Sequence, residues 1–297
     1  MARRRIIVLL VSIGTMLAWS TPADAAFPGQ PARVRFMRID SDYELFVMRS
    51  NGTAVRRVTT NTVHDADARV SPNGSRIVFW RQPPGELDGE IYTMWSDGTH
   101  VRRLTNNDDE DQTPNWSPDG ARIVFRSDRM DFQIDLYRMN ADGSGVGRIT
   151  SNSTRESLPT WSPDGAWIAY TLEQLGADME VARIRPNGTG FQLLTNNSGT
   201  DDFTADWSPD GNDLAVWSDA DGDFEIYTLS SGGGSLHRVT RNSADDVNAF
   251  WLPSGNRIVF NREDAHDLEI HSIRPDGTGI LRLTANTVED YLIRNVT

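Results

Sequence analysis

Short apolar runs bounded by turn residues recur along most of the chain. The run Arg122-Ile123-Val124-Phe125-Arg126 is rich in β-branched and aromatic residues, follows a Pro118-Asp119-Gly120 turn and precedes a second apolar run that ends before Asp142-Gly143. Runs of this length and composition predict β-strands, and Asp-Gly is a turn that joins the two strands of a hairpin. One such unit therefore predicts four short strands, at residues 112–117, 122–126, 135–139 and 147–150.

This unit repeats along the chain with a period of 44 to 46 residues. Each repeat opens on a carboxylate, and a Ser-Pro-Asp-Gly turn or a variant of it follows in the first five repeats. The opening carboxylates are Asp65, Asp111, Glu156, Asp202, Asp246 and Asp290. A fixed period in the forties combined with strand-like segments is typical of a β-propeller.

The two ends of the repeat region complement each other. The segment Arg33–Phe36 matches the second strand of a repeat, so the first repeat lacks its innermost strand, and the spare segment Asp290–Val296 matches the missing one. Pairing of these segments would close the ring and leave no open sheet edge. The sequence therefore predicts an all-β fold: a six-bladed β-propeller of four-stranded antiparallel blades, closed by pairing of the C-terminal strand with the first blade, with residues 26–297 as a single domain.

The first 25 residues have the pattern of a signal peptide. Arg3, Arg4 and Arg5 precede a mostly apolar stretch over residues 6–19, and Ala23-Asp24-Ala25 supplies a cleavage motif. The apolar stretch is short for a membrane anchor, which is the alternative interpretation. There is no cysteine for a lipid anchor or a disulfide. We therefore expect a protein that is exported, either secreted or periplasmic.

The formal net charge is −13. This balance argues against nucleic acid and anionic membrane surfaces as partners, because both attract positive charge. Alternate connections of an antiparallel blade lie on opposite faces of the ring, and all but eight of the 42 acidic residues fall in or beside the connections of one face. The eight are Asp24, Asp97, Asp119, Asp142, Asp164, Asp210, Asp213 and Asp276.

Two patterns build this acidic face. The six opening carboxylates are expected to surround the mouth of the central channel, and an Asp-x-Glu pair such as Asp88/Glu90 opens the third strand of most repeats. A protein or basic peptide segment is the partner that such a face would attract. The alternative is that the opening carboxylates are structural, accepting backbone N–H bonds or pairing with an arginine of the adjacent blade.

One loop carries a candidate calcium site. Asp219, Asp221, Asp223 and Glu225 alternate along a glycine-containing loop, as the oxygen ligands do in the first half of an EF-hand. The glutamate at the twelfth position of that motif is missing, because Ser230 stands there. The alternative is a polar hairpin loop with solvated carboxylates. No cofactor other than calcium is predicted.

The repeat resembles that of TolB-type β-propellers. The residues that carry the resemblance are Trp116-Ser117-Pro118-Asp119-Gly120, Ile123-Val124-Phe125, Leu136-Tyr137-Arg138-Met139, Asp142-Gly143 and Ile149-Thr150. The resemblance extends over residues 32–297 and implies a bacterial periplasmic or secreted propeller that binds cell-envelope proteins. Relative to TolB, we expect a stand-alone propeller without the N-terminal α/β domain.

No catalytic motif is recognisable. The chain has no cysteine nucleophile and no Gly-x-Ser-x-Gly motif, and its five histidines form no zinc-binding pattern. We therefore predict a monomeric protein-binding scaffold and not an enzyme. The alternative is an envelope enzyme or a carbohydrate-binding protein, a carboxylate-based hydrolase or lyase that uses the same face.

Overall fold

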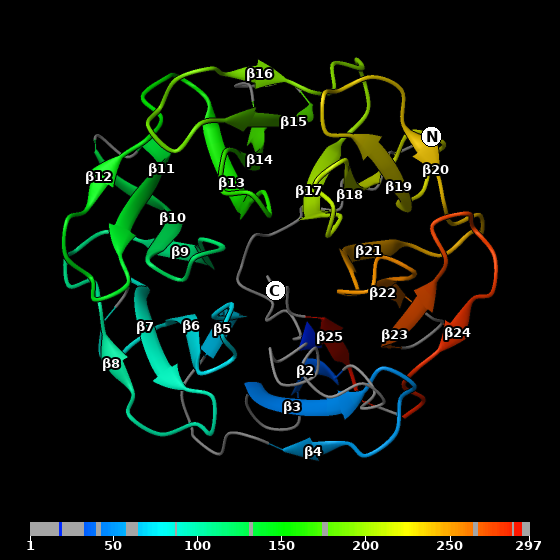
Figure 1. The fold of residues 1–297 in the computed structure, drawn as a ribbon, viewed down its shortest axis with the longest axis horizontal. Coiled ribbons are helices and arrows are strands. Elements are labelled where there is room, and N and C mark those ends of the chain that lie inside the picture. Colours follow the sequence, from blue (N-terminus) through cyan, green and yellow to red (C-terminus); the bar gives the residue numbers. More distant parts are fainter. Residues whose placement is uncertain are drawn as a thin grey trace.

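The structure is a computed structural model that describes residues 18–19, 33–39, 43–57, 65–86, 88–130, 133–173, 178–263, 267–286 and 288–292. Six sheets stand around a central axis like the blades of a propeller, each sheet running outward from the axis (Figure 1). The predicted all-β, six-bladed fold is confirmed. Within these residues, no helix is long and apolar enough to cross a membrane.

Each blade runs from an innermost to an outermost strand in chain order, except that the first blade takes its innermost strand from the C-terminus. The strands of the first blade are β25 (Asp290–Leu292), β2 (Arg33–Ile39), β3 (Tyr43–Arg49) and β4 (Arg56–Arg57); those of the second are β5 (Asp65–Val70), β6 (Arg76–Arg81), β7 (Glu90–Trp95) and β8 (Arg102–Arg103); those of the third are β9 (Asp111–Trp116), β10 (Arg122–Met130), β11 (Gln133–Asn140) and β12 (Gly147–Arg148). The strands of the fourth blade are β13 (Arg155–Trp161), β14 (Ile168–Glu173), β15 (Met179–Ile184) and β16 (Gln192–Leu193); those of the fifth are β17 (Asp202–Trp207), β18 (Asp213–Ser218), β19 (Glu225–Ser230) and β20 (His237–Arg238); those of the sixth are β21 (Asp246–Trp251), β22 (Ile258–Glu263), β23 (Leu268–Ile273) and β24 (Leu281–Arg282).

The ring closes as predicted. Strand β25 pairs antiparallel with β2, in the register Phe36 to Leu292, Met37 to Tyr291 and Arg38 to Asp290. A two-residue strand, β1 (Ala18–Trp19), pairs with the other end of β2 through Val34 and Arg33. Apart from β1, the predicted signal peptide lies outside the described residues, as do residues 293–296 of the closing segment.

The hydrophobic core lies between the blades. Buried residues of each blade pack on those of the next; Val78 and Ile91 of the second blade, for example, pack with Trp116, Ile123 and Phe125 of the third. The tryptophans that end the innermost strands form part of this packing. The indole N–H groups of Trp116 and Trp207 donate hydrogen bonds of 3.1 Å to backbone carbonyls of the preceding blade.

The turn that follows each innermost strand fits its sequence. Asp119 accepts hydrogen bonds from the Ser117 hydroxyl at 2.6 Å and from the Ala121 N–H at 2.9 Å, and Gly120 has a φ of 68°, a conformation that favours glycine. A Cβ on Gly120 would lie 3.6 Å from Pro72 of the previous turn. The turns therefore sit side by side around the channel on one face, and the acidic connections lie on the other.

Candidate functional site

The six opening carboxylates lie where the sequence places them, at or next to the first residue of an innermost strand. They are buried: Asp65 is 3% exposed and the other five are 0% exposed. A buried carboxylate needs a compensating charge or several hydrogen bonds, because loss of hydration destabilises its ionised form. What surrounds each carboxylate therefore decides what it can do.

Four of the six carboxylates form two-pronged ion pairs with an arginine. The N–O distances lie between 2.6 and 3.0 Å in the pairs Asp65–Arg81, Asp111–Arg129, Asp246–Arg262 and Asp290–Arg38. Each arginine belongs to the second strand of the same blade, and not to the adjacent blade. The guanidinium of Arg129 also lies over the rings of Phe125 and Tyr137.

The acids of the third strands are held in a second, similar way. Glu90, Asp135, Glu225 and Glu269 are fully buried, and each accepts a hydrogen bond from an arginine of the outermost strand, in the pairs Glu90–Arg103, Asp135–Arg148, Glu225–Arg238 and Glu269–Arg282. A threonine two residues after the arginine donates to the acid in several blades, as Thr150 does to Asp135 at 3.2 Å. These arginines were not among the residues predicted from the sequence, although an arginine stands two residues before the threonine in five of six blades.

These two sets of acids meet between the blades. The third-strand acid of one blade lies beside the opening carboxylate of the next, and the Asn242 amide N–H groups donate to both Glu225 and Asp246, at 3.1 and 2.8 Å. We call each such site a junction. At the junction between the fifth and sixth blades, two carboxylates therefore face two guanidinium groups, Arg238 and Arg262.

The junction between the fourth and fifth blades differs from this pattern. Its acids are Glu180 and Asp202, but Leu193 stands at the position of the outermost-strand arginine and Ser218 pairs across from Asp202. In the part of the chain that the structure describes, no arginine bonds either acid. Neither side-chain oxygen of Asp202 has a hydrogen-bond partner, although the side chain is fully buried.

The surroundings of Asp202 favour its neutral form. Burial raises the pKa of Asp202 to about 6, and the nearby Glu180 carboxylate adds to the rise. Ser218, Thr195 and Asn197 lie close enough to oppose this rise in pKa, but none completes a hydrogen bond to Asp202. The Thr195 hydroxyl already donates to Glu180 at 2.6 Å.

We predict that this group makes the protein less stable as the pH rises from about 4 to about 6. The folded-state pKa of Asp202 lies above the ordinary value of 3.8, so the folded protein retains a proton that the unfolded chain releases in this window. In chelator-containing buffer at pH 8, Asp202→Asn should raise the free energy of unfolding by about 3 kcal/mol. At pH 4 the two proteins should differ little. Urea unfolding at both pH values measures this, and an equal effect of the substitution at pH 4 and pH 8 would contradict it.

Further carboxylates form clusters at the rim of the acidic face. Burial and the neighbouring Asp128 raise the pKa of Asp109. Burial and the neighbouring Asp245 raise the pKa of Asp223 in the same way. At the junction between the fourth and fifth blades, burial and the carboxylates of Asp201 and Asp178 raise the pKa of Asp219.

The structure does not bring the four predicted calcium ligands together as one cluster. Asp221 and Glu225 both pair with Arg238, and the Asp221 carboxylate also accepts a hydrogen bond of 3.0 Å from the Tyr227 hydroxyl. Asp219 instead faces the junction between the fourth and fifth blades, where it accepts a hydrogen bond of 2.8 Å from the Asp201 N–H. Calcium binding by these four residues stays a prediction.

One group of three acids has ligand atoms close enough to share a metal ion. In the described residues, Glu86, Asp88 and Glu90 have carboxylate oxygens within 4.8 Å of one another. Arg103 donates to Glu86 at 2.8 and 2.9 Å and to Glu90 at 2.7 Å. A guanidinium therefore already binds two of these three acids, and one oxygen of Asp88 is buried without a hydrogen-bond partner.

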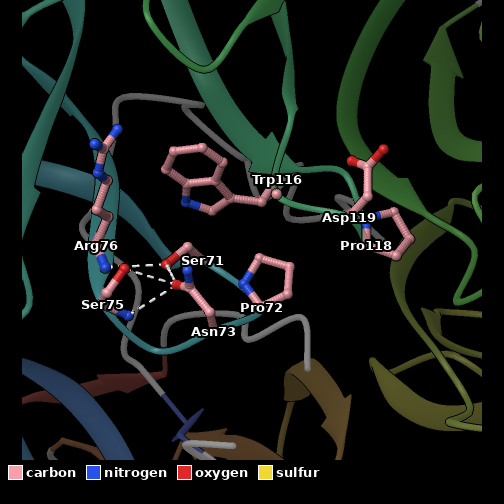
Figure 2. A pocket seen from close by; sticks show the side chains of 9 residues that line it. Ser71, Pro72, Asn73, Ser75, Arg76, Trp116, Pro118 and Asp119 are labelled. Atoms are coloured by element: carbon pink, nitrogen blue, oxygen red, sulfur yellow. Dashed lines mark hydrogen bonds between the residues drawn. The ribbon is translucent and has the colours of Figure 1, made fainter.

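The opposite face carries a hollow of about 590 Å³ between the turns of the second and third blades. Figure 2 shows Trp116 and Pro118 on one side and the turn from Ser71 to Arg76 on the other. The Asn73 carboxamide oxygen accepts from the hydroxyls of Ser71 and Ser75 at 2.8 and 2.7 Å. Because these polar groups bond one another within the turn, they are not available to bind a ligand in the hollow.

The comparisons with known proteins agree with this architecture. Residues 69–204 match the TolB beta propeller domain. The putative TolB from Agrobacterium tumefaciens is 18% identical, with a TM-score of 0.72 over 88% of this chain and 93% of that chain. TolB from Acinetobacter baumannii is 17% identical, with a TM-score of 0.63 over 90% of this chain and 72% of that chain.

Enzymes share the fold as well. An oligogalacturonate lyase in complex with manganese is 14% identical, with a TM-score of 0.60 over 84% of this chain and 73% of that chain. No curated protein matches the sequence. Residues 69–204 thus carry a TolB beta propeller domain, within a chain that folds as a six-bladed β-propeller.

Proposed function

We propose that this chain is an exported binding scaffold that holds a basic segment of a protein partner against the acidic face, over the channel mouth. The observation that carries the proposal is the set of rim clusters, in which neighbouring carboxylates add to the rise in pKa that burial causes for Asp109, Asp219 and Asp223. Like charges held together destabilise a fold, so their concentration on one face favours a role in binding.

The contact residues of this proposal are the rim acids and not the six opening carboxylates. Asp65, Asp111, Asp246 and Asp290 are buried and paired with arginines, which leaves them little attraction for a partner. Asp109, Asp128 and Asp245 are only partly buried and can be reached by a partner. A basic segment that crosses the rim would bring positive charge to these partly buried carboxylates.

The experiment compares two triple variants that remove the same charge. The rim variant carries Asp109→Asn, Asp128→Asn and Asp245→Asn. The control carries Asp97→Asn, Asp142→Asn and Asp276→Asn in the hairpin turns of the other face, where Asn51 and Asn187 already occupy the equivalent position. Because asparagine makes the same turn, the control should fold normally.

We expect the immobilised wild type and the control to capture a basic protein from envelope extract, with capture weakening as salt is raised to about 0.5 M. The rim variant should capture at least about tenfold less, which corresponds to about 1.4 kcal/mol. Quantitative mass spectrometry of the eluates measures this. Equal capture by the rim variant and the control would overturn the proposal.

The second candidate is an envelope enzyme or carbohydrate-binding protein. The observation in its favour is the acid pair Glu180 and Asp202, since a carboxyl group with a pKa of about 6 beside a second acid is a common arrangement for acid–base chemistry. Turnover of a glycan such as oligogalacturonate that Asp202→Asn abolishes would establish it. Absence of turnover across a panel of acidic and neutral glycans would leave the scaffold as the proposed function.

A further inference from the structure

The junction between the fourth and fifth blades lacks the positive charge that the corresponding junctions contain. Two guanidinium groups neutralise two carboxylates between the second and third blades, between the fifth and sixth, and between the sixth and first. Between the third and fourth blades, Arg148 pairs with Asp135, while Glu156 accepts from two threonine hydroxyls. Glu180 and Asp202 are thus the junction pair with no guanidinium among the described residues.

The loop at this junction also differs in length. Asn107, Asn242 and Asn286 stand four residues before the opening carboxylate and donate an amide N–H to it at 2.7 to 2.9 Å. Asn197 stands five residues before Asp202, in a loop that contains Gly199 at a φ of 82°. The Asn197 side-chain oxygen is buried and has no hydrogen-bond partner.

We propose that this junction binds one divalent cation of the calcium class, held by the carboxylates of Asp202 and Glu180 and by the side-chain oxygen of Asn197. A single divalent cation supplies the same charge as the two guanidinium groups of a complete junction. The donors are all oxygen atoms, which suits a hard cation, and calcium accepts irregular sets of carboxylate and amide oxygens. Asp178 and Asp219 accept hydrogen bonds from the Gly199 and Asp201 N–H groups in the loop of this junction, and their negative charge attracts a cation.

The unpaired oxygens of Asp202 are the observation that separates this site from an ordinary acidic cluster. A fully buried carboxylate with no donor to either oxygen is costly unless a proton or a cation compensates it. The proposal does not depend on the rim as a protein-binding surface, since Asp202 and Glu180 are both buried.

The third blade shows where an arginine could supply the missing positive charge at this junction. The segments Ser127-Asp128-Arg129 and Ser218-Asp219-Ala220 are equivalent. Asp128 and Asp219 each accept a hydrogen bond of 2.8 Å from the backbone N–H of the residue just before the innermost strand of their blade. Arg129 reaches Asp111 from this position at 2.7 Å. Ala220 is exposed, so Ala220→Arg can place a guanidinium beside Asp202 without displacing the core.

The experiment is a calorimetric titration with calcium chloride at pH 8, on protein stripped with chelator. At this pH Asp202 is ionised, so a bound proton does not compete. We expect one calcium ion per wild-type chain, at least about tenfold weaker binding for Asp202→Asn, and no binding for Ala220→Arg. Asp109→Asn, which removes a rim carboxylate at a junction that has both arginines, should bind as the wild type does.

Thermal unfolding provides the second readout. Calcium should raise the Tm of the wild type and of Asp109→Asn, whereas Ala220→Arg should have a raised Tm without calcium and no further response to it. Absence of calcium binding by the wild type would overturn the proposal. Equal weakening by Asp109→Asn and Asp202→Asn, or unchanged binding by Ala220→Arg, would show diffuse attraction by the acidic face and overturn it as well. If Asp202→Asn does not fold, Ala220→Arg decides the outcome alone.

Discussion

Truncation before Asp290 is expected to destabilise the whole ring and not only its last strand. Strand β25 provides the innermost strand of the first blade by pairing with β2, so its removal opens the ring between the first and sixth blades. The exposed edge of β2 would then present unpaired backbone groups to solvent and to other chains. We expect loss of cooperative unfolding and a tendency to aggregate.

The contacts that would be lost account for the size of this effect. Arg38 and Asp290 form a two-pronged pair at 2.8 and 3.0 Å, and removal of one member of such a buried pair costs about 3 kcal/mol or more. The Asn261 amide donates to the Asp290 carbonyl at 2.7 Å. Tyr291 is 6% exposed, and burial of a side chain of this size contributes about 2 kcal/mol. Together these terms approach the whole stability of a typical domain.

A shorter truncation is the control. Removal of residues 293–297 alone keeps every described contact of β25, so the difference between the two truncations measures the contribution of residues 290–292. Circular dichroism during heating and light scattering follow unfolding and aggregation. If both truncated proteins unfold at the same temperature and with the same cooperativity, β25 does not hold the ring together.

The fold could be predicted from sequence because each blade is specified locally. Its hairpin turns, its apolar runs and its period all lie within about 45 residues. The bulges of the innermost strands could not be predicted in this way. Asp67, Thr113, Leu158 and Asn248 adopt φ values of 50° to 55° there, although they share no residue type. All four lie where the pairing of the innermost strand with the second strand shifts in register, which depends on the partner strand and not on the residue type.

The positions of the opening carboxylates could be predicted from the sequence, but their burial and their hydrogen-bond partners could not. The repeat places a carboxylate at the start of each innermost strand, and the structure confirms that place for all six. Their burial depends on partners such as Arg38, which is 252 residues away from Asp290 in the sequence. The exception at Asp202 is not visible in the repeat of acids, because Asp202 and Asp111 occupy the same position and are the same residue type. The difference is that no arginine bonds Asp202 among the described residues.

Replacement of Arg129 by methionine is expected to lower the free energy of unfolding by about 3 kcal/mol. The substitution leaves Asp111 fully buried, with the Asn107 amide at 2.9 Å as its remaining hydrogen-bond donor among the described contacts. Methionine can still pack on Phe125 and Tyr137, over whose rings the guanidinium lies in the wild type. The loss therefore measures the uncompensated carboxylate and not a cavity. Urea unfolding at pH 7 gives the value.

Two further variants test this interpretation. Arg155→Met removes an exposed arginine of the same face, whose distance to Glu173 is 3.9 Å, and should cost less than about 1 kcal/mol. The double variant Arg129→Met with Asp111→Asn should recover part of the loss, because it removes the buried charge together with its partner. If Arg129→Met costs no more than Arg155→Met, the pairs between arginines and opening carboxylates do not stabilise the blades. The opening carboxylates would then be better candidates for direct contact with a partner than their burial suggests.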